Sequence, residues 1–225
     1  MAGPLIEVKD LTKTYKMGTM EVRALRHVSL TIDRGDFVAI MGPSGSGKST
    51  FMNLIGCLDK PTTGSYILDG IEVAKLSDNE LAEIRNQKIG FVFQTFNLLA
   101  RTSALRNVEL PLLYNGAKNR EAIARKCLEA VGPGQRMDHK PNELSGGQQQ
   151  RVAIARALVV DPPIIFGDEP TGNLDPATSV GIMKLLDRIN REGTTVLMAT
   201  HDSGIVDQMR KRVIELDGGH VVRDQ

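Results

Sequence analysis

Alternating apolar and polar residues predict β-strands in the N-terminal third of the chain. Residues 6–8 and 28–32 show this period of two, which is typical of a strand with one face in the core. Residues 37–41 are instead continuously apolar, as expected for a strand that is buried on both faces. A glycine-rich turn follows them, and a helix is predicted from Lys48 to about Leu58.

The middle of the chain has a mainly helical pattern. Ser77 is predicted to cap a helix that starts at Asp78. Two further helices are predicted over residues 120–131 and 146–158, and a Gly-Pro-Gly sequence breaks the first of them.

Strands return in the C-terminal part. Residues 163–167 and 194–200 are apolar runs that predict buried strands. Between them, Asp175 is predicted to cap a helix that begins at Pro176. The apolar residues of this helix fall on one face: Ile182, Leu185, Leu186 and Ile189.

Hairpin turns are predicted at Asp69-Gly70 and at residues 217–219. With the elements above, they indicate an α/β fold that is interrupted by a mostly helical insertion.

Composition narrows the class of protein. The 225 residues, 41% of them hydrophobic, are enough for a sizeable core and favour one domain. A formal net charge of +1 does not fit the basic surface of a non-specific DNA binder, so we expect no nucleic-acid partner. Cys57 and Cys127 lack the spacing of a metal site, which favours buried, reduced thiols in a cytosolic protein.

Membrane segments are not evident in the sequence. No apolar stretch approaches the ~20 residues that span a bilayer. The first ten residues also lack the apolar region of a signal peptide. A role in a membrane process would therefore require a partner.

A phosphate-binding motif occupies the glycine-rich turn after residues 37–41. The eight residues from Gly42 to Ser49 match GxxxxGK[ST] at every fixed position, between a predicted strand and a predicted helix. Glycines let backbone N–H groups turn inward around phosphates, and a helix N-terminus adds partial positive charge. We expect a nucleoside triphosphate to be bound by the loop and the start of the helix: Gly42, Pro43, Ser44, Gly45, Ser46, Gly47, Lys48, Ser49 and Thr50. Lys48 would reach the β- and γ-phosphates, and the Ser49 hydroxyl would ligate Mg²⁺.

Two carboxylates follow the apolar run at 163–167. Asp168 is a candidate for the magnesium site, and the neighbouring Glu169 for orienting the attacking water. Acidic pairs at strand ends are common in solvated loops, so the pair gains its meaning from the phosphate motif.

The sequence Leu144-Ser145-Gly146-Gly147-Gln148 resembles the signature of ATP-binding-cassette (ABC) ATPases, and the helix predicted to follow it continues the resemblance. Other motifs of that family occur in order along essentially the whole chain: Gln94 of the Q-loop, Gly172-Asn173-Leu174-Asp175 of the D-loop, the switch histidine His201, and the adenine-stacking aromatic residue Tyr15. The resemblance implies one ABC ATPase domain over residues 1–225. Residues 1–93 and 159–225 would form the P-loop NTPase core, a mixed sheet with helices, with an N-terminal antiparallel β subdomain. Residues 94–158 would form a mainly helical signature subdomain.

Several of these residues have a plainer interpretation as well. Tyr15 follows a predicted strand, which would leave its ring exposed for a purine, but a core tyrosine is equally in keeping with its type. His201 is either a contact to the γ-phosphate or a surface histidine. Gln94 is either a ligand of Mg²⁺ and the attacking water or an ordinary glutamine at a strand end.

The signature has a physical logic of its own. Ser145 and the N–H groups of Gly146 and Gly147 begin a helix, which makes a second anion site without a lysine. The resemblance implies that two copies of the chain assemble head to tail around two ATP molecules. Each ATP would be held by the phosphate loop of one copy and by Ser145, Gly146, Gly147, Gln148 and Asp175 of the other.

The resemblance also implies a membrane partner. The chain is similar to small bacterial cassettes of macrolide exporters, lipoprotein-release complexes and cell-division complexes, with its N-terminal part nearer the first two and its C-terminal part nearer the last. Either an exporter or extraction motor, or a regulator of a cell-wall enzyme, fits this pattern. An integral membrane permease-type subunit would dock on the loop at Phe96, Leu98 and Leu99, with the protein on the cytoplasmic face of the membrane. Those side chains fit buried packing equally well.

Phe166-Gly167 departs from the aliphatic and alanine residues that these relatives usually carry before the acidic pair. Glycine weakens a strand by about 0.5–1 kcal/mol, so we expect an active protein of lower stability.

Overall fold

The computed structural model describes residues 3–225. Contacts divide the chain into two compact units, one formed by the residues up to Arg85 together with Leu197–Gln225, the other by Asn86–Val196. These units follow contact density alone, so the predicted helical subdomain of residues 94–158 stays a prediction.

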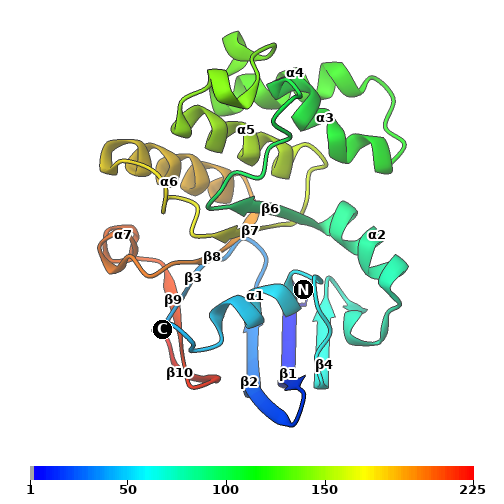
Figure 1. Ribbon diagram of the computed structural model, residues 1–225, viewed down its shortest axis with the longest axis vertical. Helices are drawn as coiled ribbons and strands as arrows, with labels where there is room; N and C mark the ends of the chain where they lie inside the picture. The colour runs from blue at the N-terminus through cyan, green and yellow to red at the C-terminus, as the bar shows by residue number, and fades with distance from the viewer. Residues whose placement is uncertain (1–2) are drawn as a thin grey trace. The chain divides into compact units, whose positions relative to one another are not determined.

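Part of the first unit is an antiparallel sheet with the strand order β2-β1-β4-β5, and Figure 1 shows β2, β1 and β4 side by side. Strand β1 (Ile6–Met17) pairs with β2 (Met20–Ile32) on one side and with β4 (Thr63–Leu68) on the other. Strand β5 (Ile71–Glu72) returns along β4 through a two-residue turn at Asp69-Gly70. Both turn residues have positive φ, 51° and 78°, as such a hairpin requires, which confirms the predicted turn.

The rest of the first unit carries the phosphate motif. Strand β3 (Phe37–Met41) runs parallel to β9 (Arg212–Asp217), and β9 is antiparallel to β10 (His220–Asp224). Helix α1 (Lys48–Ile55) follows β3 through the glycine-rich turn. Three other elements belong wholly or partly to this unit: α2 (Asp78–Lys88), the end of β8 (Thr195–Ala199) and α7 (Ser203–Met209).

The second unit joins a parallel pair of strands to helices. Strand β6 (Ile89–Phe93) pairs with β7 (Ile164–Asp168). Helices α3 (Ala104–Tyr114), α4 (Arg120–Val131) and α5 (Gly146–Leu158) contact one another, and Figure 1 shows them as one green cluster. The remaining long helix of the unit, which also touches α5, is α6 (Pro176–Arg191). Short 3₁₀ helices lie at Val73–Lys75, Gly134–Arg136 and Pro141–Glu143.

The buried strands are those that the sequence predicts. Residues 37–40, 164–167 and 195–199 are all buried, as the continuous apolar runs indicate. Helix α6 buries the predicted face, including Ile182, Leu185 and Ile189. These findings confirm an α/β fold with an antiparallel β subdomain.

Some predicted boundaries are wrong by a few residues. Helix α1 ends at Ile55 rather than near Leu58, because Gly56 leaves the helical region and Cys57 adopts a φ of 57°. Strand β7 is shifted by one residue and includes Asp168, whose backbone pairs with Phe93. Phe166 is fully buried and packs against Phe91, with 5.8 Å between ring centroids, so the unusual bulk before the acidic pair has a partner. None of the described helices is both long and apolar enough to cross a bilayer.

Candidate functional site

The phosphate loop has a backbone that only glycine fits at two positions. Gly42 has a φ of 140° and Gly47 a φ of 102°. A Cβ on Gly47 would lie 2.6 Å from the Ala24 carbonyl oxygen, and one on Gly42 would collide with the Leu216 carbonyl oxygen. Backbone from other segments therefore packs against the outer side of the loop, and the loop's own N–H groups can face inward.

Lys48 closes this loop. Its Nζ donates to the carbonyl oxygens of Gly42 at 2.7 Å and Pro43 at 2.8 Å. Helix α1 begins at Lys48, and its N-cap residue Gly47 offers no side chain to the first-turn N–H groups. An ammonium and uncapped N–H groups at one point fit a phosphate group. The remaining members of the predicted set, Pro43, Ser44, Gly45, Ser46, Ser49 and Thr50, lie in this loop or in the first turn of α1.

Ser46 adds a further sign of an anion site. Its side chain is buried, and its Oγ has no hydrogen-bond partner among the described residues. A buried hydroxyl without a partner is unfavourable by about 1–3 kcal/mol, so such groups are rare unless a ligand or water completes them.

Tyr15 lies inside β1, opposite Val22, so the expectation that it follows a strand is wrong. The strand continues to Met17 because pairing with β2 extends it. The ring is half-buried, with the Lys13 ammonium 4.9 Å from its centroid, and its hydroxyl donates to Asp59 at 3.0 Å.

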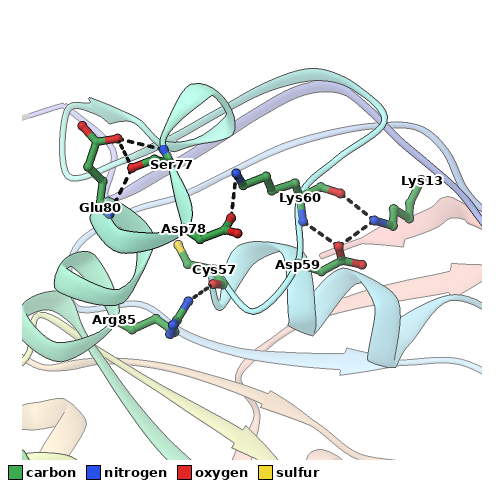
Figure 2. A network of polar contacts seen from close by, with 8 residues as sticks. All are labelled: Lys13, Cys57, Asp59, Lys60, Ser77, Asp78, Glu80 and Arg85. Carbon is green, nitrogen blue, oxygen red and sulfur yellow. Dashed lines mark hydrogen bonds and ion pairs between the residues drawn. The ribbon is translucent and has the colours of Figure 1, made fainter.

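Asp59 is the centre of a polar network after α1 (Figure 2). It accepts hydrogen bonds from Lys13 Nζ at 2.7 Å and from the Lys60 N–H at 2.7 Å. Burial by itself would raise the pKa of Asp59, but the bonds from Lys13, Lys60 and Tyr15 outweigh it and lower the pKa. The ion pair therefore fixes the segment that carries Tyr15 to the turn after the phosphate-loop helix.

The same network holds the turn at Cys57. Arg85 donates to the Cys57 carbonyl oxygen at 2.6 Å, and Lys60 pairs with Asp78 at 2.8 Å (Figure 2). Cys57 is a free, buried thiol, and burial raises its pKa to about 12. Cys127 is also free but only half-buried, so the predicted burial of the thiol is confirmed for Cys57 alone.

His201 follows β8 and has an exposed side chain. The preceding residue, Thr200, donates its N–H to the Ile40 carbonyl oxygen at 3.1 Å. Asp202 caps α7 by accepting from the Ile205 N–H at 3.0 Å. These two bonds place His201 next to the strand that leads into the phosphate loop.

The predicted acidic pair and Gln94 lie together in the second unit. The parallel register pairs Phe93 with Asp168, so Gln94 and Glu169 leave the ends of adjacent strands. Glu169 has a φ of 47°, a left-handed conformation that is unfavourable for a residue with a side chain. Strain of this kind is concentrated at functional sites.

Asn173 holds the side chain of Gln94. Gln94 Nε2 donates to Asn173 Oδ1 at 3.3 Å, and Asn173 Nδ2 donates to the Gln94 carbonyl oxygen at 3.0 Å. A Cβ on Gly172 would lie 2.7 Å from Gln94 Nε2, so a larger residue at this position would displace the Gln94 side chain. Asn173 belongs to the D-loop motif, but its contact with Gln94 was not predicted.

The signature begins a helix, as predicted, and the structure adds a cap that was not predicted. Ser145 Oγ accepts from the Gln148 N–H at 3.3 Å, and the Gln148 side chain accepts from the Ser145 N–H at 2.9 Å. This reciprocal capping leaves the N–H groups of Gly146 and Gly147 available for an anion. Asp175 caps α6 by accepting from the Thr178 N–H at 3.0 Å, which gives it a structural role beside the predicted contact with ATP.

Two residues of α5 were not predicted to matter. Gln150 is fully buried and Arg156 half-buried. The guanidinium of Arg156 donates to the carbonyl oxygens of Phe96 and Asn97, two successive residues with positive φ after Gln94. The sequence does contain a signal for Gln150: it shares a helix face with Ala153, Ile154 and Ala157, where a polar residue is unexpected.

The oxygen donors present suit magnesium better than a transition metal. Among the described residues no group of three His, Cys, Asp or Glu side chains could hold a metal ion. Mg²⁺ needs few protein ligands, because phosphates and water supply the others. The predicted ligands are all oxygen donors: the Ser49 hydroxyl, the Gln94 side-chain amide and the Asp168 carboxylate.

Comparison with known proteins places the chain among ATP-binding cassettes. The family model for the ABC transporter matches residues 25–172. An uncharacterized ABC transporter ATP-binding protein of Bacillus subtilis, YvrO, is 52% identical over 98% of this chain and 97% of its own length. The macrolide export ATP-binding/permease protein MacB of Chlorobaculum tepidum is 54% identical over 98% of this chain, which spans 34% of that relative.

Solved structures of similar sequence share the fold. MJ0796, a cassette from Methanocaldococcus jannaschii, has a dimeric structure that matches with a TM-score of 0.89 at 52% identity, covering 98% of this chain and 97% of that one. A second dimeric structure of MJ0796, in a post-hydrolysis state with ADP and Pi, matches with a TM-score of 0.89 at 50% identity and the same coverage. The chain belongs to the ABC transporter family as an ATP-binding cassette, and it is an ATPase.

Proposed function

We propose that this cassette hydrolyses ATP at composite sites, each made by two copies of the chain, and that the cycle drives a permease-type membrane partner. One observation carries the proposal: the chain has two different helix starts suited to phosphate. Helix α1 begins after Gly47, which provides no side-chain cap, and Lys48 follows directly. Helix α5 begins after Ser145, whose side chain caps it, and its motif contains no lysine. A phosphate site needs the helix start of α1 and its lysine. In the family's dimers the helix start of α5 comes from the other copy, so two copies form two complete sites.

In the first unit, Lys48 and the loop N–H groups bind the β- and γ-phosphates. Lys48 exchanges the carbonyl oxygens of Gly42 and Pro43 for phosphate oxygens, which are stronger, charged acceptors. The Tyr15 ring offers a face to adenine and is held in place by its hydroxyl bond to Asp59. His201 supplies a ring nitrogen toward the γ-phosphate.

In the second unit, Glu169 accepts a hydrogen bond from the attacking water and orients it toward the γ-phosphorus. Gln94 presents its side-chain oxygen to the same region, since its nitrogen is bound by Asn173. Positioned acid–base groups contribute about 10²–10⁴ in rate. Mg²⁺, held by Ser49, Asp168 and Gln94, would supply charge neutralisation at the phosphate oxygens.

The membrane partner is supported by the relatives' architecture. The MacB relatives carry a permease in the same chain, and this chain corresponds to 34% of the one from Chlorobaculum tepidum. Leu99, which is 48% exposed, lies in the loop after Gln94 and offers apolar surface to such a partner. Export or lipoprotein extraction is the function that we favour. Capture from membranes with a trapped dimer would separate this from a cell-division role, by the presence or absence of a permease with a large periplasmic domain.

The test uses Glu169→Gln, with Lys48→Ala as the comparison. We expect Glu169→Gln to bind ATP, to lose nearly all hydrolysis and to elute from gel filtration as a dimer only when ATP is present. Lys48→Ala should lose tight ATP binding by calorimetry and stay monomeric. A Glu169→Gln protein that remains monomeric with saturating ATP at high protein concentration would contradict the composite site.

A further inference from the structure

Gln150 connects the two loops that carry the proposed catalytic residues. Its side chain is fully buried in the second unit. Nε2 donates one hydrogen to the Phe93 carbonyl oxygen at 3.3 Å and the other to the Pro170 carbonyl oxygen, at short distance. Phe93 directly precedes Gln94, and Pro170 directly follows Glu169.

The ladder between β6 and β7 ends where these loops begin. Its last pair is Phe93 with Asp168, so the next residues, Gln94 and Glu169, lie beyond the strand pairing. Glu169 must also be kept at a φ of 47°. The two N–H donors of the Gln150 side chain connect the two loops just beyond the last strand pair. Without them, the distance between the loops could change at this point.

The side-chain oxygen of Gln150 argues against a purely structural role. Its Oε1 is buried and has no hydrogen-bond partner among the described residues. A residue kept only for stability would be better replaced by one without a buried, unsatisfied acceptor. What glutamine provides and an apolar side chain lacks is the pair of N–H donors aimed at Phe93 and Pro170.

We propose that Gln150 is a positioning residue for hydrolysis, which sets the spacing between Gln94 and Glu169 and ties both to the signature helix α5. Because Gln150 stands five residues after Ser145 on the same helix, a shift at the signature reaches the water-orienting groups through one side chain. This inference rests on the roles proposed above for Gln94 and Glu169.

The experiment compares Gln150→Met with Asn107→Leu. Asn107 is also a fully buried amide of the second unit, and its Nδ2 donates to the carbonyl oxygens of Leu99, Thr102 and Ser103. Both variants remove amide donors. Asn107 holds the loop after Gln94 at Leu99, five residues past Gln94, whereas only Gln150 bonds the residues directly next to Gln94 and Glu169. We expect kcat for ATP to fall roughly tenfold or more in Gln150→Met, since small misplacements of reacting groups have large effects. KM, ADP affinity and Tm should stay close to those of Asn107→Leu, whose kcat should match the unsubstituted protein.

A second variant, Gln150→Glu, provides a measurement that does not depend on stability: the pH dependence of kcat. A protonated carboxyl has one donor and a carboxylate has none. Burial against two carbonyl oxygens favours the protonated form. The ratio of its kcat to that of the unsubstituted protein should therefore rise as the pH is lowered from about 8 to about 6, with Tm followed in parallel.

Three outcomes overturn the proposal: an unchanged kcat in Gln150→Met, an equal loss of kcat in Asn107→Leu, or a pH-independent ratio for Gln150→Glu. If Gln150→Met does not fold, the pH series with Gln150→Glu decides. Glu169→Gln, assayed alongside, distinguishes failure of the proposed function from failure of the role of Gln150. If it hydrolyses ATP normally, the proposed function fails. If it is inactive while Gln150→Met is fully active, only the role of Gln150 fails.

Discussion

Gly42 and Gly45 both have positive φ in the phosphate loop, 140° and 79°, but their surroundings differ. A Cβ on Gly42 would meet backbone at Leu216, whereas one on Gly45 would have no atom within 4 Å. Gly45→Ala should therefore lower the free energy of unfolding by about 1 kcal/mol, from conformational strain alone. Gly42→Ala should lower it by a further ~1–3 kcal/mol. Urea unfolding of both variants measures the difference, and equal losses would show that the contact at Leu216 relaxes freely.

Single residues were predictable where their chemistry is local. The phosphate motif and the signature are fixed spacings in sequence, and a helix starts at each of them as predicted. Gln150 and Asn173 make their key contacts with residues 20 or more positions away, at Pro170 and Gln94. Residue types and spacing carry no information about such contacts, so those two roles required the structure.

Helix α6 is a case where one side chain secures an element. Asp175 accepts from the Thr178 N–H, and hydrogen bonding to Thr178 lowers the pKa of Asp175. Asp175→Ala should lower the free energy of unfolding by about 1 kcal/mol, as measured for lost N-caps. Asp187→Ala, which removes an i,i+4 ion pair with Arg191 on the same helix, should lower it by only about 0.3–0.5 kcal/mol. A loss for Asp175→Ala as small as that for Asp187→Ala would mean that the cap contributes little.

Elements were predictable in kind and less so in extent. The apolar runs predicted β3, β7 and β8, because a strand buried on both faces leaves a plain pattern. The end of β1 was not predictable from residues 6–17, since residues 12–16 show no alternation of apolar and polar side chains and belong to the strand through pairing with β2. Tyr15 was misplaced for that reason.

At the scale of the whole molecule, acid stability depends on carboxylates with lowered pKa. Asp59 is one, joining Lys13 and Tyr15 to the turn after α1. Because its folded pKa is lowered, its contribution is present above the unfolded pKa of about 4 and is lost as the pH falls through the folded pKa. The free energy of unfolding should therefore fall with pH below about 4, and less steeply in Asp59→Asn. Identical slopes in the two proteins would show that Asp59 takes no part.

Part of that acid dependence should remain in Asp59→Asn. The pKa values of four other carboxyl groups are also lowered by hydrogen bonds, those of Asp78, Glu80, Glu121 and Asp175. They are exposed, so solvent weakens the effect of each. Thermal unfolding between about pH 3 and pH 6 at constant ionic strength is the appropriate measurement.

The two bonds from Lys48 to its own loop have a consequence for selectivity. Two of the three N–H groups of the ammonium are bonded to carbonyl oxygens, at 2.7 and 2.8 Å, so a ligand that takes those two competes with the protein's own backbone rather than with water alone. Only acceptors stronger than a peptide carbonyl win this competition, and charged phosphate oxygens are such acceptors. Nucleosides, which bring no phosphate, would leave the lysine bound to Gly42 and Pro43. The loop thus selects ligands by the strength of their hydrogen-bond acceptors, in addition to their shape.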